Sequence, residues 1–241
     1  MLNTFSKSII NLVYPPICVG CNQPCFEENT NIYLCQNCYL DIARHTPPFC
    51  SKCGRGLTDT KSIQNGICSR CTNRIYFFDK AWSICRYEGL IEELIHKFKY
   101  NQKIQYETIF KQLFNEFLGA FKVLDGIDLV VPIPLHPTRL REREYNQSQI
   151  LANIISQTIN KPLALNILMR TRNTKSQVCL DEIGRKENIT GCFSINKYTK
   201  LENKSILLVD DVFTTGVTLS EAARTFKDNK LNRVFALTLA S

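Results

Sequence analysis

Two adjacent carboxylates, Asp210 and Asp211, lie between four aliphatic residues at 206–209 and a turn rich in hydroxyl groups at 214–218. This order predicts a buried strand, a loop and the start of a helix, an arrangement in which α/β proteins hold a phosphate. Loop N–H groups, hydroxyls and the helix dipole all favour the anion. Because carboxylates repel a phosphate, the pair must bind something else, and vicinal ribose hydroxyls or Mg²⁺ are the natural choices. The alternative is an ordinary strand–loop–helix corner with a chance acidic pair.

The cysteines form a second set of residues with recognisable chemistry. Eight of the twelve fall in four Cys-x-x-Cys pairs within the first 71 residues. Pairs separated by 13 or 14 residues match the spacing of zinc ribbons, because each tight turn offers two sulfurs to a tetrahedral ion. We therefore predict two structural Zn²⁺ sites. Their ligands are Cys18, Cys21, Cys35, Cys38, Cys50, Cys53, Cys68 and Cys71.

Other uses of these cysteines stay open from the pattern alone. A disulfide framework is one, although the apolar stretch at 8–13 is too short for an export signal and we expect reduced thiols. A thioredoxin-like redox pair is another, although four pairs in series argue against it. The prolines at 47 and 48 favour two consecutive ribbons. An interleaved arrangement, in which the first and third pairs share a metal, is the remaining alternative.

A cationic loop follows a second apolar run, at 128–132. Three prolines stiffen the segment 132–137, and three arginines follow at alternating positions. Guanidinium groups bind phosphate oxygens bidentately, and a stiff loop loses little entropy on binding, so we expect a pyrophosphate-side role. The alternative is a solvated charge run in which the intervening glutamates pair with the arginines. The candidates are Pro134, Leu135, Arg139, Arg141 and Arg143.

The segment from 170 to 193 is polar, cationic and only weakly periodic, as a mobile lid would be. Its candidate residues are Lys175, Gln177 and Arg185, and a plain surface loop is the alternative. Residues 97–100 line the acceptor side of the pocket or simply form a helix surface. No general base for a nucleobase stands out.

The elements that must position these groups follow from apolar periodicity. Residues 1–75 contain little that could form a core, so we expect a small zinc-stabilised domain with a short amphipathic helix at 2–13. Residues 76–241 alternate strands and helices, which predicts an α/β domain with a parallel sheet and helices on both faces. The predicted strands are 77–87, 128–132, 206–209 and 233–239, and the predicted helices are 89–99, 109–121, 148–159 and 219–227.

The charge of the 241 residues is +8 if the thiols are neutral. Two zinc ions on eight thiolates reduce it to about +4, which permits a nucleic-acid partner without requiring one. No apolar run reaches the ~20 residues of a membrane span, and we expect a cytoplasmic protein. Cations at 55, 70 and 74 lie close in sequence to aromatics at 76–78. That mixture fits a surface for single-stranded DNA or packing between domains.

The segment 206–218 resembles the phosphoribosyl-pyrophosphate (PRPP) signature of type I phosphoribosyltransferases: a hydrophobic strand, two acidic residues and Thr-Thr-Gly-x-Thr. The resemblance implies that Asp210 and Asp211 hold the ribose hydroxyls and are catalytic, that residues 214–218 wrap the 5-phosphate, and that Mg²⁺ accompanies PRPP. The implied PRPP-binding residues are Val209, Asp210, Asp211, Thr214, Thr215, Gly216, Val217 and Thr218.

Over nearly its whole length the chain resembles the ComF family of ComFC-type competence proteins. The resemblance lies in the cysteine ribbons, 87–89, 96–100, 132–137, 139–147, Gln177-x-x-Leu180, Arg185-x-x-Asn188 and the PRPP signature. It implies a type I phosphoribosyltransferase-like fold after a double zinc ribbon, and a role in natural transformation through handling of incoming single-stranded DNA. DNA-uptake or recombination proteins are the implied partners.

Two points stay open within that resemblance. The alternative to an enzyme is a non-catalytic module that binds single-stranded DNA or proteins and keeps a vestigial or sensory PRPP pocket. The acceptor and the oligomeric state are not indicated. One departure from the family pattern is Glu144, where glycine is expected, so the turn there is stiffer or less cationic than usual.

Overall fold

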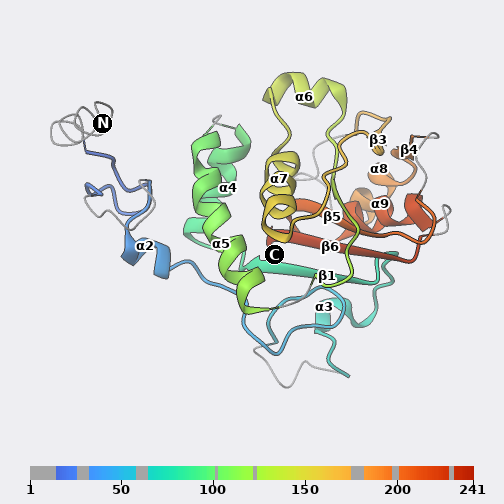
Figure 1. Cartoon of the computed structure of the whole chain (residues 1–241), viewed down its shortest axis with the longest axis horizontal. Helices are drawn as coiled ribbons and strands as arrows, with labels where there is room; N and C mark the ends of the chain where they lie inside the picture. The colour runs from blue at the N-terminus through green and yellow to red at the C-terminus, as the bar shows by residue number, and fades with distance from the viewer. Residues whose placement is uncertain are drawn as a thin grey trace.

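A computed structural model describes most of the chain (Figure 1). The described residues are 15–25, 33–57, 65–100, 103–121, 124–174, 182–196, 201–227 and 231–241. The short helix expected at 2–13 lies outside them. No helix in these ranges is long and apolar enough to cross a membrane.

The centre of the molecule is a parallel sheet of four strands, in the order β1-β6-β5-β2. Its strands are β1 (Lys80–Cys85), β2 (Leu129–Pro132), β5 (Ser205–Val212) and β6 (Arg233–Ala240). In the register, Val209 lies opposite both Pro132 and Leu237. The carboxyl ends of the strands therefore meet at one edge, where open parallel sheets bind their ligands.

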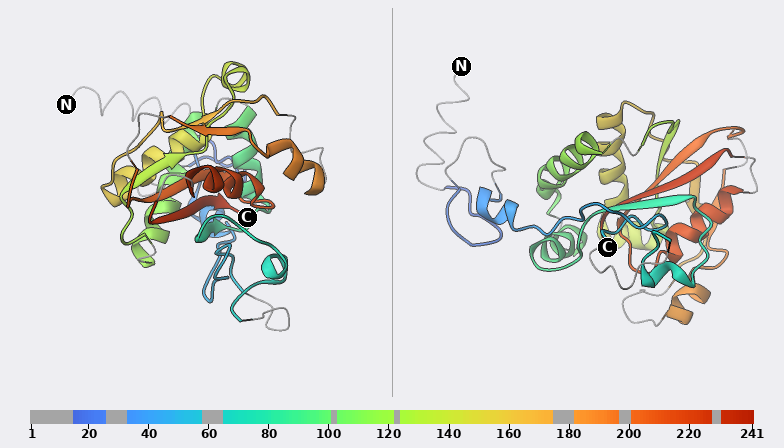
Figure 2. Two further views of the ribbon diagram at one scale, coloured as in Figure 1. Left: turned by 90° about the vertical axis from the view of Figure 1, so that its right-hand side faces the viewer. Right: turned by 90° about the horizontal axis from the view of Figure 1, so that it is seen from below.

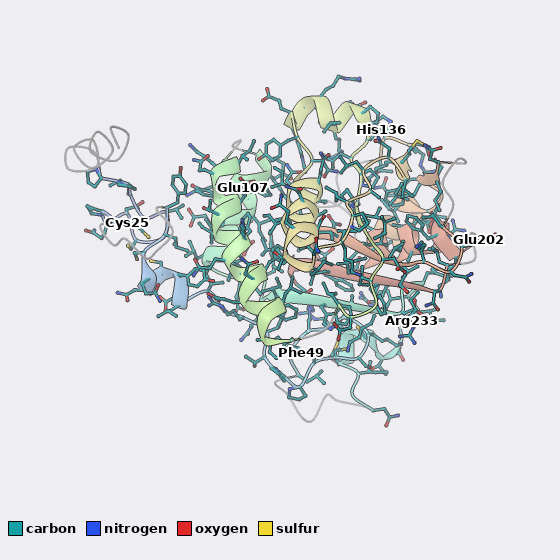
Figure 3. The ribbon with its side chains drawn as sticks, viewed as in Figure 1. Cys25, Phe49, Glu107, His136, Glu202 and Arg233 are labelled. Carbon is teal, nitrogen blue, oxygen red and sulfur yellow. The ribbon has the colours of Figure 1, made fainter. Side chains whose placement is uncertain are left out.

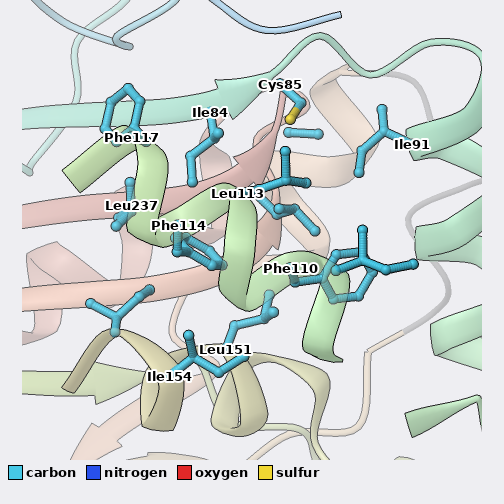
Figure 4. Packing of buried hydrophobic residues seen from close by; sticks show 14 of the residues in the cluster. Ile84, Cys85, Ile91, Phe110, Leu113, Phe114, Phe117, Leu151, Ile154 and Leu237 are labelled. Carbon is cyan, nitrogen blue, oxygen red and sulfur yellow. The ribbon is translucent and has the colours of Figure 1, made fainter. Parts of the chain in front are cut away.

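Helices cover both faces of this sheet, because its strands are apolar on both sides. Leu207 and Val209 point into a core shared with α4 (Leu90–Tyr100), α5 (Glu107–Ala120) and α7 (Gln147–Ile159). Ile206 and Leu208 point the other way, into a core shared with α9 (Val217–Lys227). Figure 4 shows how Phe110 and other α5 side chains fill the first core. The predicted fold class is confirmed.

The structure also contains elements that apolar periodicity did not predict. Part of the proline-stiffened loop is a helix, α6 (Pro137–Arg143), which His136 caps by accepting a hydrogen bond from the N–H of Thr138 at 3.3 Å. A proline at the first helical position costs no hydrogen bond, so the proline-rich sequence is compatible with this helix. Short elements escape a periodicity argument: α2 (Gln36–Leu40), α3 (Ser69–Thr72), η2 (Ile104–Tyr106), β3 (Leu168–Arg170), α8 (Glu182–Ile189) and β4 (Phe193–Ile195).

The cysteine-rich segment runs along the outside of this α/β unit (Figures 1 and 2). Its first part lies beyond α4 and α5, and its second part lies beside β1. The connection between the parts pairs with the edge of β1, because the N–H of His45 donates to Ile84 O and the N–H of Arg86 donates to Ala43 O, both at 2.8 Å. Phe49, labelled in Figure 3, then packs edge-on against Phe117 and Phe121 at the end of α5.

Candidate functional site

The eight predicted zinc ligands form two separate groups of four. Cys18, Cys21, Cys35 and Cys38 make one group, and Cys50, Cys53, Cys68 and Cys71 make the other, with all sulfurs of a group within 4.8 Å of one another. The pairing is therefore consecutive, and the interleaved alternative is excluded. Sulfurs 2.3 Å from a tetrahedral zinc lie about 3.8 Å apart. The Sγ atoms of Cys21 and Cys35 are 3.8 Å apart and those of Cys53 and Cys68 are 3.7 Å apart, so both groups fit the metal.

The acidic pair lies at the carboxyl end of β5 and is held from two helices. Ser148 Oγ, in the first turn of α7, donates to Asp210 Oδ1 at 2.8 Å. Lys99, near the end of α4, forms an ion pair with Asp211 Oδ1 at 2.8 Å. The N–H of Asp211 donates to Asp210 Oδ1 at 3.0 Å. Both carboxylates are thus fixed before any ligand arrives.

These contacts set the charge of the pair. Burial and the neighbouring Asp211 carboxylate raise the pKa of Asp210 to about 7, while Lys99 and Ser148 oppose the rise. Burial works to lower the pKa of Lys99, but the attraction of Asp211 and Asp210 raises it above its ordinary value. Near neutral pH the site therefore holds a charged lysine and two carboxyl groups of which Asp210 is on the point of titrating.

The hydroxyl-rich loop has features of a phosphate cradle. Gly216 has a φ of +77°, and a Cβ there would lie 2.4 Å from the Phe213 ring and 2.8 Å from the Tyr76 ring, so only glycine fits. The loop leads directly into α9, whose first N–H groups have no partner within the helix. Thr215 Oγ1 is buried without a hydrogen-bond partner. An anion at the helix start would provide acceptors for these donors.

A cleft of about 410 Å³ joins the acidic pair to this loop. Among the candidates for the pyrophosphate side, Leu135, Arg139 and Arg143 line it, whereas Pro134 and Arg141 do not. Arg139 is anchored by a hydrogen bond to Thr174 O at 3.1 Å. The lid candidates Lys175 and Gln177, and the Arg185 side chain, lie outside the described residues.

Three cleft residues are not among the specific site residues predicted from the sequence. Ser148 lies in the first turn of α7, where serine is a common residue, and its contact with Asp210 is what distinguishes it. Lys99 fits a helix surface as well as a pocket in the sequence, and its ion pair places it in the pocket. Arg170 also lines the cleft, with its Nε buried and without a hydrogen-bond partner. For Lys99 and Arg170, the sequence shows only a cation near a motif, and such cations are too common to identify a site residue.

The second zinc ribbon touches the phosphate loop directly. Arg74 Nη1 and Tyr76 Oη donate to Thr215 O at 3.1 and 3.3 Å. The rings of Tyr76 and Phe78 stack 4.7 Å apart, and both pack edge-on against Phe213. Of the two interpretations of the aromatics at 76–78, packing between the ribbon and the sheet domain is therefore the one that fits Tyr76 and Phe78.

Comparison with known proteins identifies the zinc-binding segment and relatives of most of the chain. The family model of a double zinc ribbon domain matches residues 9–72. Competence protein F from Haemophilus influenzae is 28% identical over 195 residues, which cover 79% of this chain and 82% of that protein. Competence protein ComFC from Bacillus subtilis is 28% identical over 79% of this chain and 76% of its own length. DNA utilization protein YhgH from Escherichia coli (strain K12) is 27% identical over 79% of this chain and 89% of its own length.

Solved structures overlap with about half of the chain. An adenine phosphoribosyl transferase from Trypanosoma brucei is 13% identical, with 54% of this chain and 51% of that chain covered and a TM-score of 0.36. A hypoxanthine phosphoribosyltransferase from Staphylococcus aureus is 21% identical, with 55% and 63% covered and a TM-score of 0.35. These overlaps are too limited to assign a substrate. With its double zinc ribbon and its match to competence proteins along most of its length, the chain is similar to the ComF family.

Proposed function

We propose that this chain binds PRPP with Mg²⁺ in the cleft and transfers the phosphoribosyl group to an acceptor, in the service of DNA uptake in the cytoplasm. The observation that carries the proposal is the fixed acidic pair, which lines one cleft together with Thr214, Gly216 and Thr218 of the hydroxyl-rich loop. A phosphate and a ribose are the two chemical groups that such a pairing suits.

Each part of PRPP has matching residues. The loop 214–218 and the start of α9 would hold the 5-phosphate, and Asp210 and Asp211 would hold the ribose hydroxyls. Arg139, Arg143 and Arg170, which line the same cleft, would face the pyrophosphate. Mg²⁺ prefers carboxylate and phosphate oxygens, and it would neutralise the leaving pyrophosphate.

The transfer is a displacement at the anomeric carbon through a transition state with oxocarbenium character. The acceptor forms a bond to that carbon while the bond to the pyrophosphate oxygen breaks, and the pyrophosphate leaves with the electron pair. Carboxylates beneath the ribose stabilise the positive charge that develops on the ring, and cations stabilise the leaving group. The contribution of the protein is positioning and electrostatics rather than a covalent step.

The place of this chemistry in DNA uptake rests on the relatives. Two of them are named competence proteins and a third is named a DNA utilization protein, and all are matched over 79% of this chain. The same names support single-stranded DNA and the DNA-uptake or recombination proteins as partners.

The binding test uses isothermal titration of the zinc-loaded protein with PRPP and Mg²⁺. Asp210→Asn combined with Asp211→Asn should weaken PRPP binding by about a hundredfold or more and abolish pyrophosphate release. Asp125→Asn, at an exposed carboxylate in a turn, is the matched control and should leave binding unchanged. An unmodified protein that does not bind PRPP would refute the proposal.

A binding module with a vestigial or sensory PRPP pocket gives a different pattern. PRPP would bind without pyrophosphate release across a panel of bases and amines. Single-stranded DNA would then bind in a strongly salt-dependent manner, and binding would survive the substitutions at the acidic pair.

A further inference from the structure

A second and larger cavity, of about 760 Å³, lies between the second zinc ribbon and the carboxyl edge of the sheet. Arginines at 55, 70, 74 and 86 line it, and none of these lines the PRPP cleft. The two hollows share Tyr87 and the stretch 212–214 at the end of β5. A molecule in this cavity would therefore contact Thr214 and Thr215 of the phosphate loop without contacting Arg139 or Arg143.

The cations of this cavity are held in place by the fold. Arg55 donates from Nε to Ser241 Oγ at 2.9 Å and from Nη2 to Phe213 O at 3.2 Å. Arg70 lines the same cavity as Arg55, so the two guanidinium groups face one hollow. Holding like charges together costs free energy that an anion between them would recover.

The opposing charge at the cavity is small. Glu88 is exposed and is engaged by Arg86 at 3.1 Å. The backbone oxygen of Ser241 accepts a hydrogen bond from the N–H of Tyr87 at 3.0 Å. Of the ligands of the second zinc site, Cys68 lines the cavity. Among the described residues, no carboxylate forms an ion pair with Arg55 or Arg70.

We propose that this cavity is the acceptor site and that it recognises its acceptor through a phosphate group. The inference rests on the proposed phosphoribosyl transfer. An acceptor held there would present its nucleophile to the anomeric carbon opposite the pyrophosphate. Its lone pair forms the new bond, the pyrophosphate leaves with the electrons of the broken bond, and the proton of the nucleophile passes to water. Bidentate guanidinium groups would fix the acceptor's phosphate at the far end of the cavity.

The test measures binding of adenosine 3′-phosphate to the zinc-loaded full chain saturated with PRPP and Mg²⁺. With PRPP bound, the PRPP cleft is occupied, so the probe reports on the arginine cavity. Arg70→Gln combined with Arg86→Gln should weaken the probe by about tenfold or more and leave PRPP affinity unchanged. These two side chains are exposed and are not among the contacts to the phosphate loop. Arg233→Gln with Lys204→Gln removes two exposed cations elsewhere and should change nothing.

Adenosine without a phosphate is the second control and should bind much more weakly. Equal binding of adenosine and its phosphate, equal loss in the control variant, or no binding of the probe would overturn the proposal. Absence of PRPP binding would instead refute the proposed function. A short single-stranded oligonucleotide as competitor identifies the source of the phosphate: displacement of the probe indicates a nucleic-acid strand, and its persistence indicates a small phosphorylated molecule.

Discussion

The two zinc ribbons have the same four ligands at almost the same spacing, yet they support different parts of the molecule. In the first, Cys18 and Leu34 belong to the core that contains the helices α4 and α5, far from the loop 214–218. In the second, the N–H of Ala81 on β1 donates to Lys52 O at 2.8 Å, and Arg74 donates to Thr215 O. One ribbon extends the helical layer, whereas the other is part of the wall of the candidate site.

The difference shows that cysteine spacing specifies the metal but not the part of the fold that the metal supports. Each ion fixes a short segment that could not fold from burial alone. The consequence of losing that ion depends on the contacts that the segment makes. The second ribbon is therefore expected to couple metal binding to PRPP binding, and the first to affect stability alone.

The largest effect should come from removing one ion at a time. Cys50→Ser with Cys53→Ser removes two ligands of the second site, so the zinc content should fall from two ions per chain to one. PRPP affinity should fall by about a hundredfold, because the donors to Thr215 O and Phe213 O are no longer held. Titration calorimetry and zinc analysis measure the two quantities.

Cys18→Ser with Cys21→Ser is the matched variant in the first ribbon. It should also lose one ion and lower the melting temperature, but PRPP affinity should stay within about threefold of the unmodified protein. Equal loss of PRPP affinity in both variants would show that the two ribbons do not differ in this way.

A single hydroxyl gives a smaller and more specific test of the same contact. Tyr76→Phe keeps the stacking on Phe78 but removes the hydrogen bond to Thr215 O. One such bond contributes about 1 kcal/mol, so PRPP affinity should fall by about fivefold. Tyr33→Phe, at a tyrosine that packs on Tyr106 near the first ribbon, is the control and should have no effect on PRPP binding. Equal PRPP affinity in Tyr76→Phe and Tyr33→Phe would contradict a role of the second ribbon in PRPP binding through this hydrogen bond.

The sequence predicted the parallel sheet, its main helices and the zinc ligands because each leaves a periodic or fixed-spacing pattern. It could not predict which ribbon faces the loop, since the contacts of Arg74 and Tyr76 with Thr215 join positions more than a hundred residues apart. The role of Ser148 could not be predicted for the same reason, because it depends on a partner 62 positions away. Residues of α6 were expected to form a loop because three prolines suggested no helix, but proline is tolerated at a first helical position.

Protonation of the acidic pair should make the affinity for PRPP depend on pH. Because burial and Asp211 raise the pKa of Asp210 to about 7, Asp210 is partly protonated below neutral pH. A ligand with Mg²⁺ favours the ionised form, so affinity should rise by about tenfold per pH unit below pH 7 and level off above it. Calorimetry in buffers of different ionisation enthalpy should detect release of up to about one proton on binding.

The free protein should show the opposite dependence in its stability. The folded state holds the Asp210 proton more tightly than the unfolded state, so this group's contribution is complete below the unfolded pKa near 4 and is lost as pH rises to about 7. The first-ribbon variant should keep the proton release, and Asp210→Asn should abolish it. Unchanged release in Asp210→Asn would assign the proton to another group.

The smallest change in stability is expected for a substitution at Glu144, which follows α6 and belongs to neither ribbon. It therefore gives a baseline for the stability changes in the ribbon variants. Glu144 ends α6 with a φ of +67°, in the left-handed region that favours glycine. Glu144→Gly should raise the free energy of unfolding by about 0.5–1 kcal/mol, because relief of the left-handed backbone outweighs the added chain entropy. Glu142→Gly, two residues earlier within the helix, is the matched control and should lower it by a similar amount. Urea denaturation measures both, and a loss of stability in both variants would mean that the glutamate side chain at 144 makes a contact worth more than the backbone relief.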